Sequence, residues 1–433
     1  MSPEIILTIG MFGSLVICIM LGVSLAFALG AIGAISAFIM YGPTGFMPIV
    51  TGVFNYMWML LLAAVPMFVY IGVALSKSGI AEDMFHAFYL WSGRLRGGLA
   101  IGSSCFAAAL SAMTGNCSAS TVTTGLVAMP SMRQKNYDEK IIFGSICSAG
   151  TLGILIPPSI PLIIIGMMTG QSIGKLFAGG LIAGLGILAA FILYILTMAW
   201  LYPNLCPALA ENPPLKNKLV ALKSVALPTL IIISILGSLF LGIATPTEAA
   251  SVGALAVIIC VAIRRELSWT FLKESAYQTA SITGMVLWIM FGAGGFVAVY
   301  SGSGGIAFVQ SVFMGLDVSP WVLIFLFQIF VLILGMFLDP MGIILLCIPI
   351  FYPVITALRF DPIWYGVVFN IALCVGYITP PFGYNLFYLK SLSPKTDMRT
   401  IYISVAPFII IMIAALFLFM LFPQIILWLP NKM

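Results

Sequence analysis

The sequence predicts an all-α polytopic membrane protein built from two inverted repeats. Of its 433 residues, 62% are hydrophobic and 7% are charged. A soluble domain carries roughly 25% charged residues, so this composition indicates a chain that crosses a membrane several times. The repeats are indicated by two double prolines inside apolar segments, Pro157-Pro158 and Pro380-Pro381, which lie 223 residues apart.

The residue types argue against several other functions. The net charge of +5 comes from loop lysines and arginines, so we expect no nucleic-acid partner. The eight cysteines are scattered without a C-x-x-C pair, which favours small core residues over a disulfide or metal set. A single histidine, His86, leaves little for acid–base chemistry, and the sequence has no P-loop pattern. We therefore expect no enzyme activity.

The first repeat is predicted to cover residues 1–202. A polar stretch at 111–121 interrupts an apolar segment there, which predicts a re-entrant hairpin. An uncharged loop is expected at 42–53, before a span that ends near residue 76. The elements in order are scaffold spans within 4–76, the hairpin at 101–132, a broken helix at 141–169 and a span at 176–200.

The broken helix follows from the chemistry of proline. A double proline removes two amide donors and clashes with the preceding turn, so no regular helix passes through it. In lipid, such a backbone is tolerated only where it is buried in protein or lines a polar cavity. Breaks at matching places in the two halves therefore predict the binding site of a transporter.

A polar linker at 203–224 is predicted to join the halves on the cytoplasmic side. The second repeat, 225–433, follows the plan of the first: spans within 225–300, a hairpin at 320–357, a broken helix at 363–389 and a span at 402–422. The shift of 223 residues places Asn116 on Asp339, so each hairpin tip lies 41 residues before its own double proline.

The distribution of lysine and arginine predicts how the repeats are oriented. Positive charge marks cytoplasmic loops, and matched loops of the two halves carry it unequally. Loops 133–140 and 264–273 are therefore predicted to be cytoplasmic, and loops 42–53 and 356–363 external. Matched loops then fall on opposite sides, as inverted repeats require.

Polar groups at the hairpin tips are the candidates for chemistry. Asp339 is a candidate for cation coordination because a carboxylate inside the membrane is costly, and the alternative is a local helix cap. Glu248, in Thr245-Pro-Thr-Glu248, is expected in the first turn of a helix. Hydroxyls between Ser111 and Thr121 either bind a cation together with freed carbonyls or bond to the backbone of packed helices.

Three motifs resemble those of a known family, the large transmembrane subunit of tripartite ATP-independent periplasmic (TRAP) transporters. They are Gly150-Thr-Leu-Gly-Ile-Leu-Ile-Pro-Pro-Ser-Ile-Pro161, Gly376-Tyr-Ile-Thr-Pro-Pro-Phe-Gly383 and Gly335-Met-Phe-Leu-Asp339. The resemblance covers nearly the whole chain. It implies an elevator-type ion-transporter fold in the lipid bilayer of the bacterial inner membrane. It also implies two partners, a small four-helix transmembrane subunit and a periplasmic substrate-binding protein.

The same resemblance implies sodium as a transported coupling ion, at two or more sites. Its residues would come from the two hairpin tips and the two broken helices: Ser111, Thr114, Gly153, Ile156 and Pro158 for the first site, and Gly335, Asp339, Gly376, Thr379 and Phe382 for the second. Asn116 and Ser159 are implied to face the solute. The tip Thr114-Gly-Asn-Cys117 departs from the family's serine-rich pattern, because Cys117 offers no oxygen.

The favoured function is sodium-coupled uptake of a small organic anion, such as a C4-dicarboxylate, a sugar acid or a sialic acid. A stand-alone sodium-dicarboxylate carrier is the alternative among transporters, and co-purification with a small subunit separates the two. A membrane-embedded enzyme is the alternative from another class, and it is disfavoured by the scarcity of histidine and acidic residues.

Overall fold

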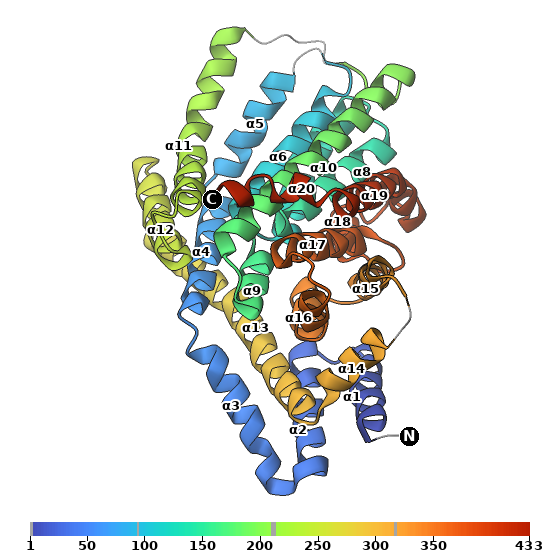
Figure 1. The fold of residues 1–433 in the computed structure, drawn as a ribbon. Helices are drawn as coiled ribbons and strands as arrows, with labels where there is room; N and C mark the ends of the chain where they lie inside the picture. Colours follow the sequence, from blue (N-terminus) through green and yellow to red (C-terminus); the bar gives the residue numbers. More distant parts are fainter. Residues whose placement is uncertain (1–2, 93–94, 209–213, 316–317) are drawn as a thin grey trace.

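The computed structural model describes residues 3–92, 95–208, 214–315 and 318–433, and the regular structure within them is entirely helical (Figure 1). The first half holds α1 (Pro3–Met20), α2 (Leu25–Tyr41), α3 (Phe46–Met57), α4 (Ala64–Lys77), α5 (Ile80–Ser92), α6 (Gly98–Thr114), α7 (Cys117–Gln134), α8 (Glu139–Thr151), α9 (Ile160–Thr169) and α10 (Ile173–Leu201). The second half holds α11 (Leu215–Phe240), α12 (Pro246–Ile263), α13 (Trp269–Gly302), α14 (Gly305–Met314), α15 (Pro320–Gly335), α16 (Pro340–Ala357), α17 (Pro362–Ile378), α18 (Tyr384–Leu392), α19 (Met398–Leu421) and α20 (Pro423–Leu427). Short 3-10 turns are η1 (Gly42–Gly45), η2 (Leu60–Ala63), η3 (Leu152–Ile154) and η4 (Pro430–Lys432).

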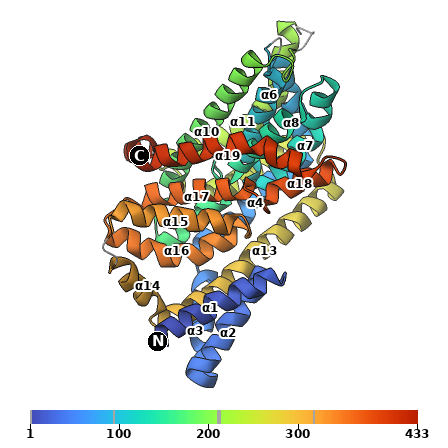
Figure 2. The same ribbon diagram turned by 90° about the vertical axis from the view of Figure 1, so that its right-hand side faces the viewer.

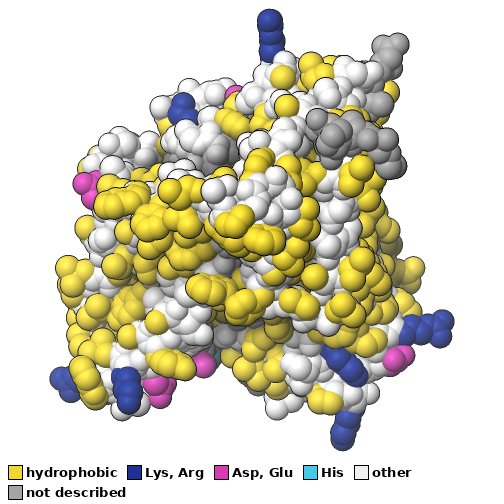
Figure 3. Space-filling model, turned by 90° about the horizontal axis from the view of Figure 1, so that it is seen from below, with side chains coloured by type: hydrophobic (Ala, Val, Ile, Leu, Met, Phe, Trp, Pro, Cys, Tyr) yellow, Lys and Arg dark blue, Asp and Glu magenta, His cyan; other side chains and the backbone are white. Residues whose placement is uncertain are grey.

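The predicted all-α membrane fold is confirmed. Among the described residues, seven helices are long and apolar enough to cross a membrane. Their outer faces are apolar, as a lipid environment requires: seen from below, hydrophobic side chains cover much of the surface, and lysines and arginines stand mainly near its edges (Figure 3). The long helix α13 runs obliquely across the molecule in Figure 2.

The helix order of the first half recurs in the second. Adding 223 to the bounds of α7 gives 340–357, which are the bounds of α16. The same shift takes the first residue of α8 to the first residue of α17, and α9 to within one residue of the start of α18. Matched segments of the chain therefore fold into matched helices.

Capping aspartates explain why two of these matched helices begin where they do. The Asp138 carboxylate accepts a hydrogen bond from the Lys140 amide at 2.8 Å, and the Asp361 carboxylate accepts one from the Trp364 amide at 2.9 Å. Each thereby satisfies an amide that a helix start leaves without an intrahelical partner. Glu248 occupies the first turn of α12 as predicted, and it forms a capping box with Thr245.

Three predicted boundaries were wrong. The loop expected at 42–53 contains η1 and most of α3, and the span expected at 54–76 is broken between α3 and α4 by η2. The linker expected at 203–224 is shorter, because α11 begins at Leu215; residues 209–213 lie outside the described residues. Apolar residues in 46–57 and 219–222 form helix with their neighbours. The boundaries were predicted from the lack of charge in 42–53 and from the lysines in 216–223, and these signals do not end a helix here.

Polar contacts between the two halves join segments that are far apart in the sequence. The Arg133 guanidinium donates to the Ser393 hydroxyl at 2.8 Å, although 260 residues separate the two. Beside α5, Arg264 forms an ion pair with Asp83 at 2.7 Å. At another point, Gln171 donates to the hydroxyl of Tyr352 at 2.9 Å.

The two broken helices form the centre of the fold. Every residue of α17 from Ile363 to Ile378 is buried, as is every residue of α8 from Ile141 to Thr151. Helix α17 packs against α10, α15 and α19, and helix α8 packs against α6, α7 and α19. The two helix breaks therefore lie deep inside the protein, where an irregular backbone is tolerated in a membrane.

Candidate functional site

Both predicted helix breaks are confirmed. The first helix ends at Thr151, continues as η3 to Ile154, and resumes as α9 at Ile160. The second ends at Ile378 and resumes as α18 at Tyr384. The Pro157–Pro158 and Pro380–Pro381 peptide bonds are both cis.

Side chains from both halves bond to carbonyls at the first break. The Thr151 carbonyl accepts from the thiols of Cys117 at 3.2 Å and Cys374 at 3.5 Å. The Ile154 carbonyl accepts from the Asn370 amide and from the Ser159 hydroxyl. Ser159 also caps α9, so its side chain stabilises the break itself; the solute contact implied for it stays a prediction.

The first hairpin tip packs directly on the first break. Gly115 has a φ of +59°, and a Cβ placed on it would lie 2.7 Å from the carbonyl oxygen of Pro158. A Cβ on Gly153 would lie 3.1 Å from the carbonyl carbon of Asn116. The positive φ and the close approach at Gly115 require a glycine there. The structure therefore brings together the tip and the break from which the first ion site was predicted.

The side chains of Ser111 and Ile156, two residues of that predicted first site, also make contacts within the fold. The Ser111 hydroxyl donates to the Ser120 hydroxyl at 2.8 Å inside the hairpin. The Ile156 side chain packs on α10, where a Cβ on Gly184 would lie 2.5 Å from it. Thr114 stays at the tip, bonded to the Asn116 carbonyl at 3.3 Å.

The second tip and break meet through an equally close backbone contact. A Cβ on Gly376 would lie 2.7 Å from the Cα of Gly335. The Thr379 hydroxyl donates to the Val375 carbonyl at 2.6 Å. The ring of Phe382 is half exposed and packs against Phe337, with ring centroids 5.4 Å apart.

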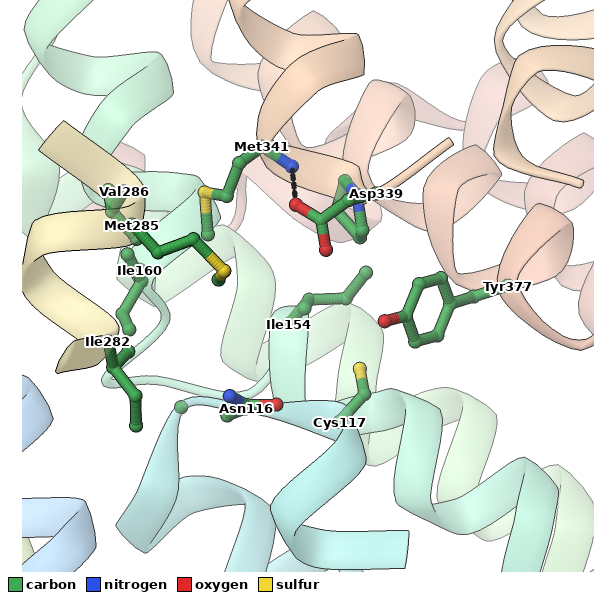
Figure 4. A pocket seen from close by; sticks show the side chains of 12 residues that line it. Asn116, Cys117, Ile154, Ile160, Ile282, Met285, Val286, Asp339, Met341 and Tyr377 are labelled. Atoms are coloured by element: carbon green, nitrogen blue, oxygen red, sulfur yellow. Dashed lines mark hydrogen bonds between the residues drawn. The ribbon is translucent and has the colours of Figure 1, made fainter. Parts of the chain in front are cut away.

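Asp339 and Asn116 occupy matching positions on the two tips. Asp339 caps α16 by accepting from the Met341 amide at 3.0 Å, and its other carboxylate oxygen points toward the cavity in Figure 4. Asn116 caps α7 by accepting from the Ser118 amide at 2.9 Å. The capping alternative for Asp339 is thus confirmed, and the second carboxylate oxygen stays available for a ligand.

The two tips and the two breaks surround one cavity of about 50 Å³, here called the central cavity. Its walls are Gly115, Asn116, Cys117, Ile154, Ile160, Ile282, Met285, Val286, Asp339, Pro340, Met341 and Tyr377 (Figure 4). Three pairs of these residues are related by the 223-residue shift: Asn116 with Asp339, Cys117 with Pro340, and Ile154 with Tyr377. The cavity therefore lies where the two repeats meet.

The N-terminal ends of three helices meet at the central cavity. They belong to α7, α9 and α16, which contribute Cys117, Ile160 and Pro340 to its walls. A helix N-terminus carries a partial positive charge and unpaired amides, which favour an anion. The carboxylate of Asp339 is the one formal charge among the lining residues. It favours a cation, whereas the helix N-termini favour an anion.

Sequence reasoning missed Tyr377 and the contribution of α13. Tyr377 points its hydroxyl toward the cavity, between Asp339 and Cys117 (Figure 4). Its match in the first repeat is Ile154, which the sequence did not single out either, so the shift alone could not find it. Ile282, Met285 and Val286 lie on one face of α13, and only three-dimensional packing places that face against the hairpins.

Comparison with known proteins identifies the family. Residues 12–425 match the DctM component of the tripartite ATP-independent periplasmic transporters. The chain belongs to this family. It is 30% identical over 373 residues to the C4-dicarboxylate TRAP transporter large permease protein DctM of Pseudomonas aeruginosa, covering 86% of both chains. It is also 30% identical over 373 residues to the sialic acid TRAP transporter large permease protein SiaM of Vibrio cholerae, with 86% of both chains covered.

A solved transporter shares the fold of this permease. The YdaH transporter of Alcanivorax borkumensis, described as having an unusual topology, aligns with a TM-score of 0.64 at 13% identity. The alignment covers 95% of this chain and 98% of that one. The relatives are transporter permeases, so the predicted class, a multi-pass membrane transport protein of the TRAP type, is confirmed.

Proposed function

We propose that this permease carries a small organic anion together with sodium across the bacterial inner membrane. The observation that supports this most strongly is the convergence of two hairpin tips and two helix breaks on the central cavity. Discontinuous helices of this kind offer amides to an anion at their N-terminal ends and carbonyls to a cation at their C-terminal ends.

Asp339 is the main argument for a cation. Its carboxylate lines the cavity, and no lysine, arginine or histidine lies among the lining residues to neutralise it. A carboxylate inside the membrane without a positive partner is costly, and a sodium ion held beside it would reduce that cost. Sodium at this tip would also offset part of the charge of an anionic solute in the same cavity.

The solute class is proposed from the relatives and from the cavity together. The two relatives are named for C4-dicarboxylates and for sialic acid, and this chain is equally similar to both. Both named solutes carry carboxylates, which fit the helix N-termini of the cavity. We therefore propose a carboxylated solute delivered by a periplasmic binding protein, with a small four-helix membrane subunit as the partner of this chain.

The packing supports an elevator movement. Helices of the hairpins pack on the broken helices, as α6 and α7 do on α8 and as α15 does on α17, and α16 packs on both α9 and α13. The wall formed by α13 belongs to a different group, because α13 packs most extensively on α2, α3 and α4. In the proposed movement, the first group carries the site past α13.

Uptake into proteoliposomes tests this function. The permease, reconstituted with its small subunit and supplied with its binding protein, is expected to accumulate labelled succinate or N-acetylneuraminate only under an inward sodium gradient. Uptake that persists when sodium is replaced by potassium would contradict sodium coupling. Uptake that needs neither partner would instead support the stand-alone carrier.

A further inference from the structure

Three cavities lie in sequence along α13. The central cavity borders a second one of about 40 Å³, here called the middle cavity, between α4, the first hairpin tip and α13. The two share three lining residues, Asn116, Ile160 and Ile282. In Figure 4 these three lie together on one side of the central cavity, so they form the wall between the two spaces.

The middle cavity borders a larger, charged one. This third cavity, here called the basic vestibule, has a volume of about 740 Å³ and shares Gln278 with the middle cavity. It is lined by Lys77, Trp269, Thr270, Lys273, Glu274, Tyr277, Gln278 and Ser281. Two lysines against one glutamate make it positive overall, although Lys77 is paired with Glu274 at 2.8 Å.

The residues that α13 contributes follow a single helical stripe. Gln278, Ile282 and Met285 are spaced four and three residues apart, which places them on one face of the helix. From Glu274 in the vestibule to Met285 in the central cavity, the stripe spans about 17 Å at 1.5 Å per residue. Its vestibule end borders the segment predicted from charge to be cytoplasmic.

We propose that this stripe of α13 lines the path by which the solute leaves the central cavity for the cytoplasm. Ile160 and Ile282 stand between the central and middle cavities, Gln278 stands between the middle cavity and the vestibule, and Lys273 attracts the anion at the mouth. The inference rests on the proposed function for the identity of the solute. The existence and charge of the path can be tested without transport.

Cysteine labelling from the cytoplasmic side tests the path directly. In a background free of the native cysteines, Gln278→Cys, Ile282→Cys and Met285→Cys are each treated with an anionic, membrane-impermeant methanethiosulfonate in inside-out vesicles. Ala280→Cys and Gly284→Cys are the controls. They lie at similar depth on other faces of the helix, Ala280 is exposed, and no atom lies within 4 Å of the Cβ position of Gly284.

Cysteines on the stripe are expected to react at least about 10-fold faster than the two controls, with Gln278→Cys fastest because it lines the vestibule itself. Such a difference corresponds to about 1.4 kcal/mol in the barrier to reaction. Equal rates on all faces, or reaction only from outside the cell, would overturn the path and would indicate that lipid or a partner subunit covers the stripe.

The charge of the mouth is tested with the same protein. At Gln278→Cys, the ratio of rates for an anionic and a cationic reagent is expected to fall about 3- to 10-fold when Lys273→Gln is added, because a charged mouth concentrates ions of opposite sign. Lys216→Gln, an exposed lysine outside the vestibule, should leave the ratio unchanged. An unchanged ratio of rates in Lys273→Gln would show that Lys273 does not attract anions to the mouth of the path.

A transport measurement separates the path from the function. Ile282→Trp is expected to abolish uptake while sodium still raises the melting temperature of the purified protein, and Gly284→Trp should transport normally. Normal uptake by Ile282→Trp would place the path elsewhere and leave sodium-coupled transport intact. Absence of uptake by the unmodified protein, with stripe labelling as expected, would instead contradict the proposed function alone.

Discussion

Asn116 and Asp339, 223 residues apart, cap matching helices and face each other across one cavity. Each accepts a hydrogen bond from the amide two residues further on, at 2.9 Å and 3.0 Å. The amide of Asn116 is neutral and the carboxylate of Asp339 is charged. The two tips therefore share a structural task and differ in the ligand that they favour.

Replacing Asp339 by asparagine should weaken sodium binding and leave the helix cap in place, because asparagine caps helices as well as aspartate does. Loss of a charge partner in a desolvated site is expected to cost ~1.4–3 kcal/mol, or roughly 10- to 150-fold in sodium affinity. Sodium titration of uptake by the reconstituted variant measures this. Asp361→Asn, at a cap on α17 away from the cavity, is the control and should keep the normal sodium curve.

Removing the Asn116 cap should lower thermal stability more than it changes the sodium dependence of uptake. Asn116→Ala deletes the acceptor for the Ser118 amide and is expected to lower stability by about 0.5–2 kcal/mol. Asn116→Ser keeps a capping oxygen and should lose little. Thermal unfolding of the two purified variants compares them; equal melting temperatures would show that the cap contributes little in this setting.

The contact between Gly335 and Gly376 should tolerate no side chain. Because a Cβ on Gly376 would lie 2.7 Å from the Cα of Gly335, Gly376→Ala must push the second tip from its break, and a cost of about 1–3 kcal/mol is typical of such overpacking. Gly284→Ala, with open space around it, should be neutral or slightly stabilising. If both variants melted at the same temperature, the tip and break would not be in rigid contact.

Single-cysteine labelling tests the inverted arrangement of the repeats. Lys140→Cys and Lys395→Cys lie on segments that the Arg133–Ser393 hydrogen bond joins, so both are expected to label only from the cytoplasm. Ala357→Cys, between the second hairpin and the second broken helix, should label only from outside. Labelling of Lys140→Cys and Ala357→Cys from the same side would contradict inverted repeats.

The sequence predicted the helix breaks because proline chemistry is local. Pro157-Pro158 and Pro380-Pro381 stop a helix in any surroundings, and the shift between them located both hairpin tips. Residues that act through packing could not be predicted in this way. Asn370 reaches the Ile154 carbonyl across 216 residues, and the stripe of Ile282 on α13 lines the cavity only because the hairpins pack there.

The local sequence pattern also gave a wrong prediction of where helix α3 begins. The segment 42–53 lacks charge and contains Gly42-Pro43, which suggested a loop, but Phe46 to Met57 form the helix α3. Hydrophobic contacts with α13 stabilise that helix, and tertiary packing of this kind regularly outweighs weak local signals.

The scaffold departs from its own repeat at one place. Adding 223 to Phe46 gives Trp269, the start of α13, so the continuous 34-residue helix α13 corresponds to the jointed series α3, η2 and α4. Two identical halves related by inversion would give an empty carrier two resting conformations of equal free energy, one facing each side. Because α13 is one continuous helix and its counterpart is broken at η2, the two conformations differ in free energy. A carrier built in this way spends unequal times facing the two sides even when no solute or gradient is present.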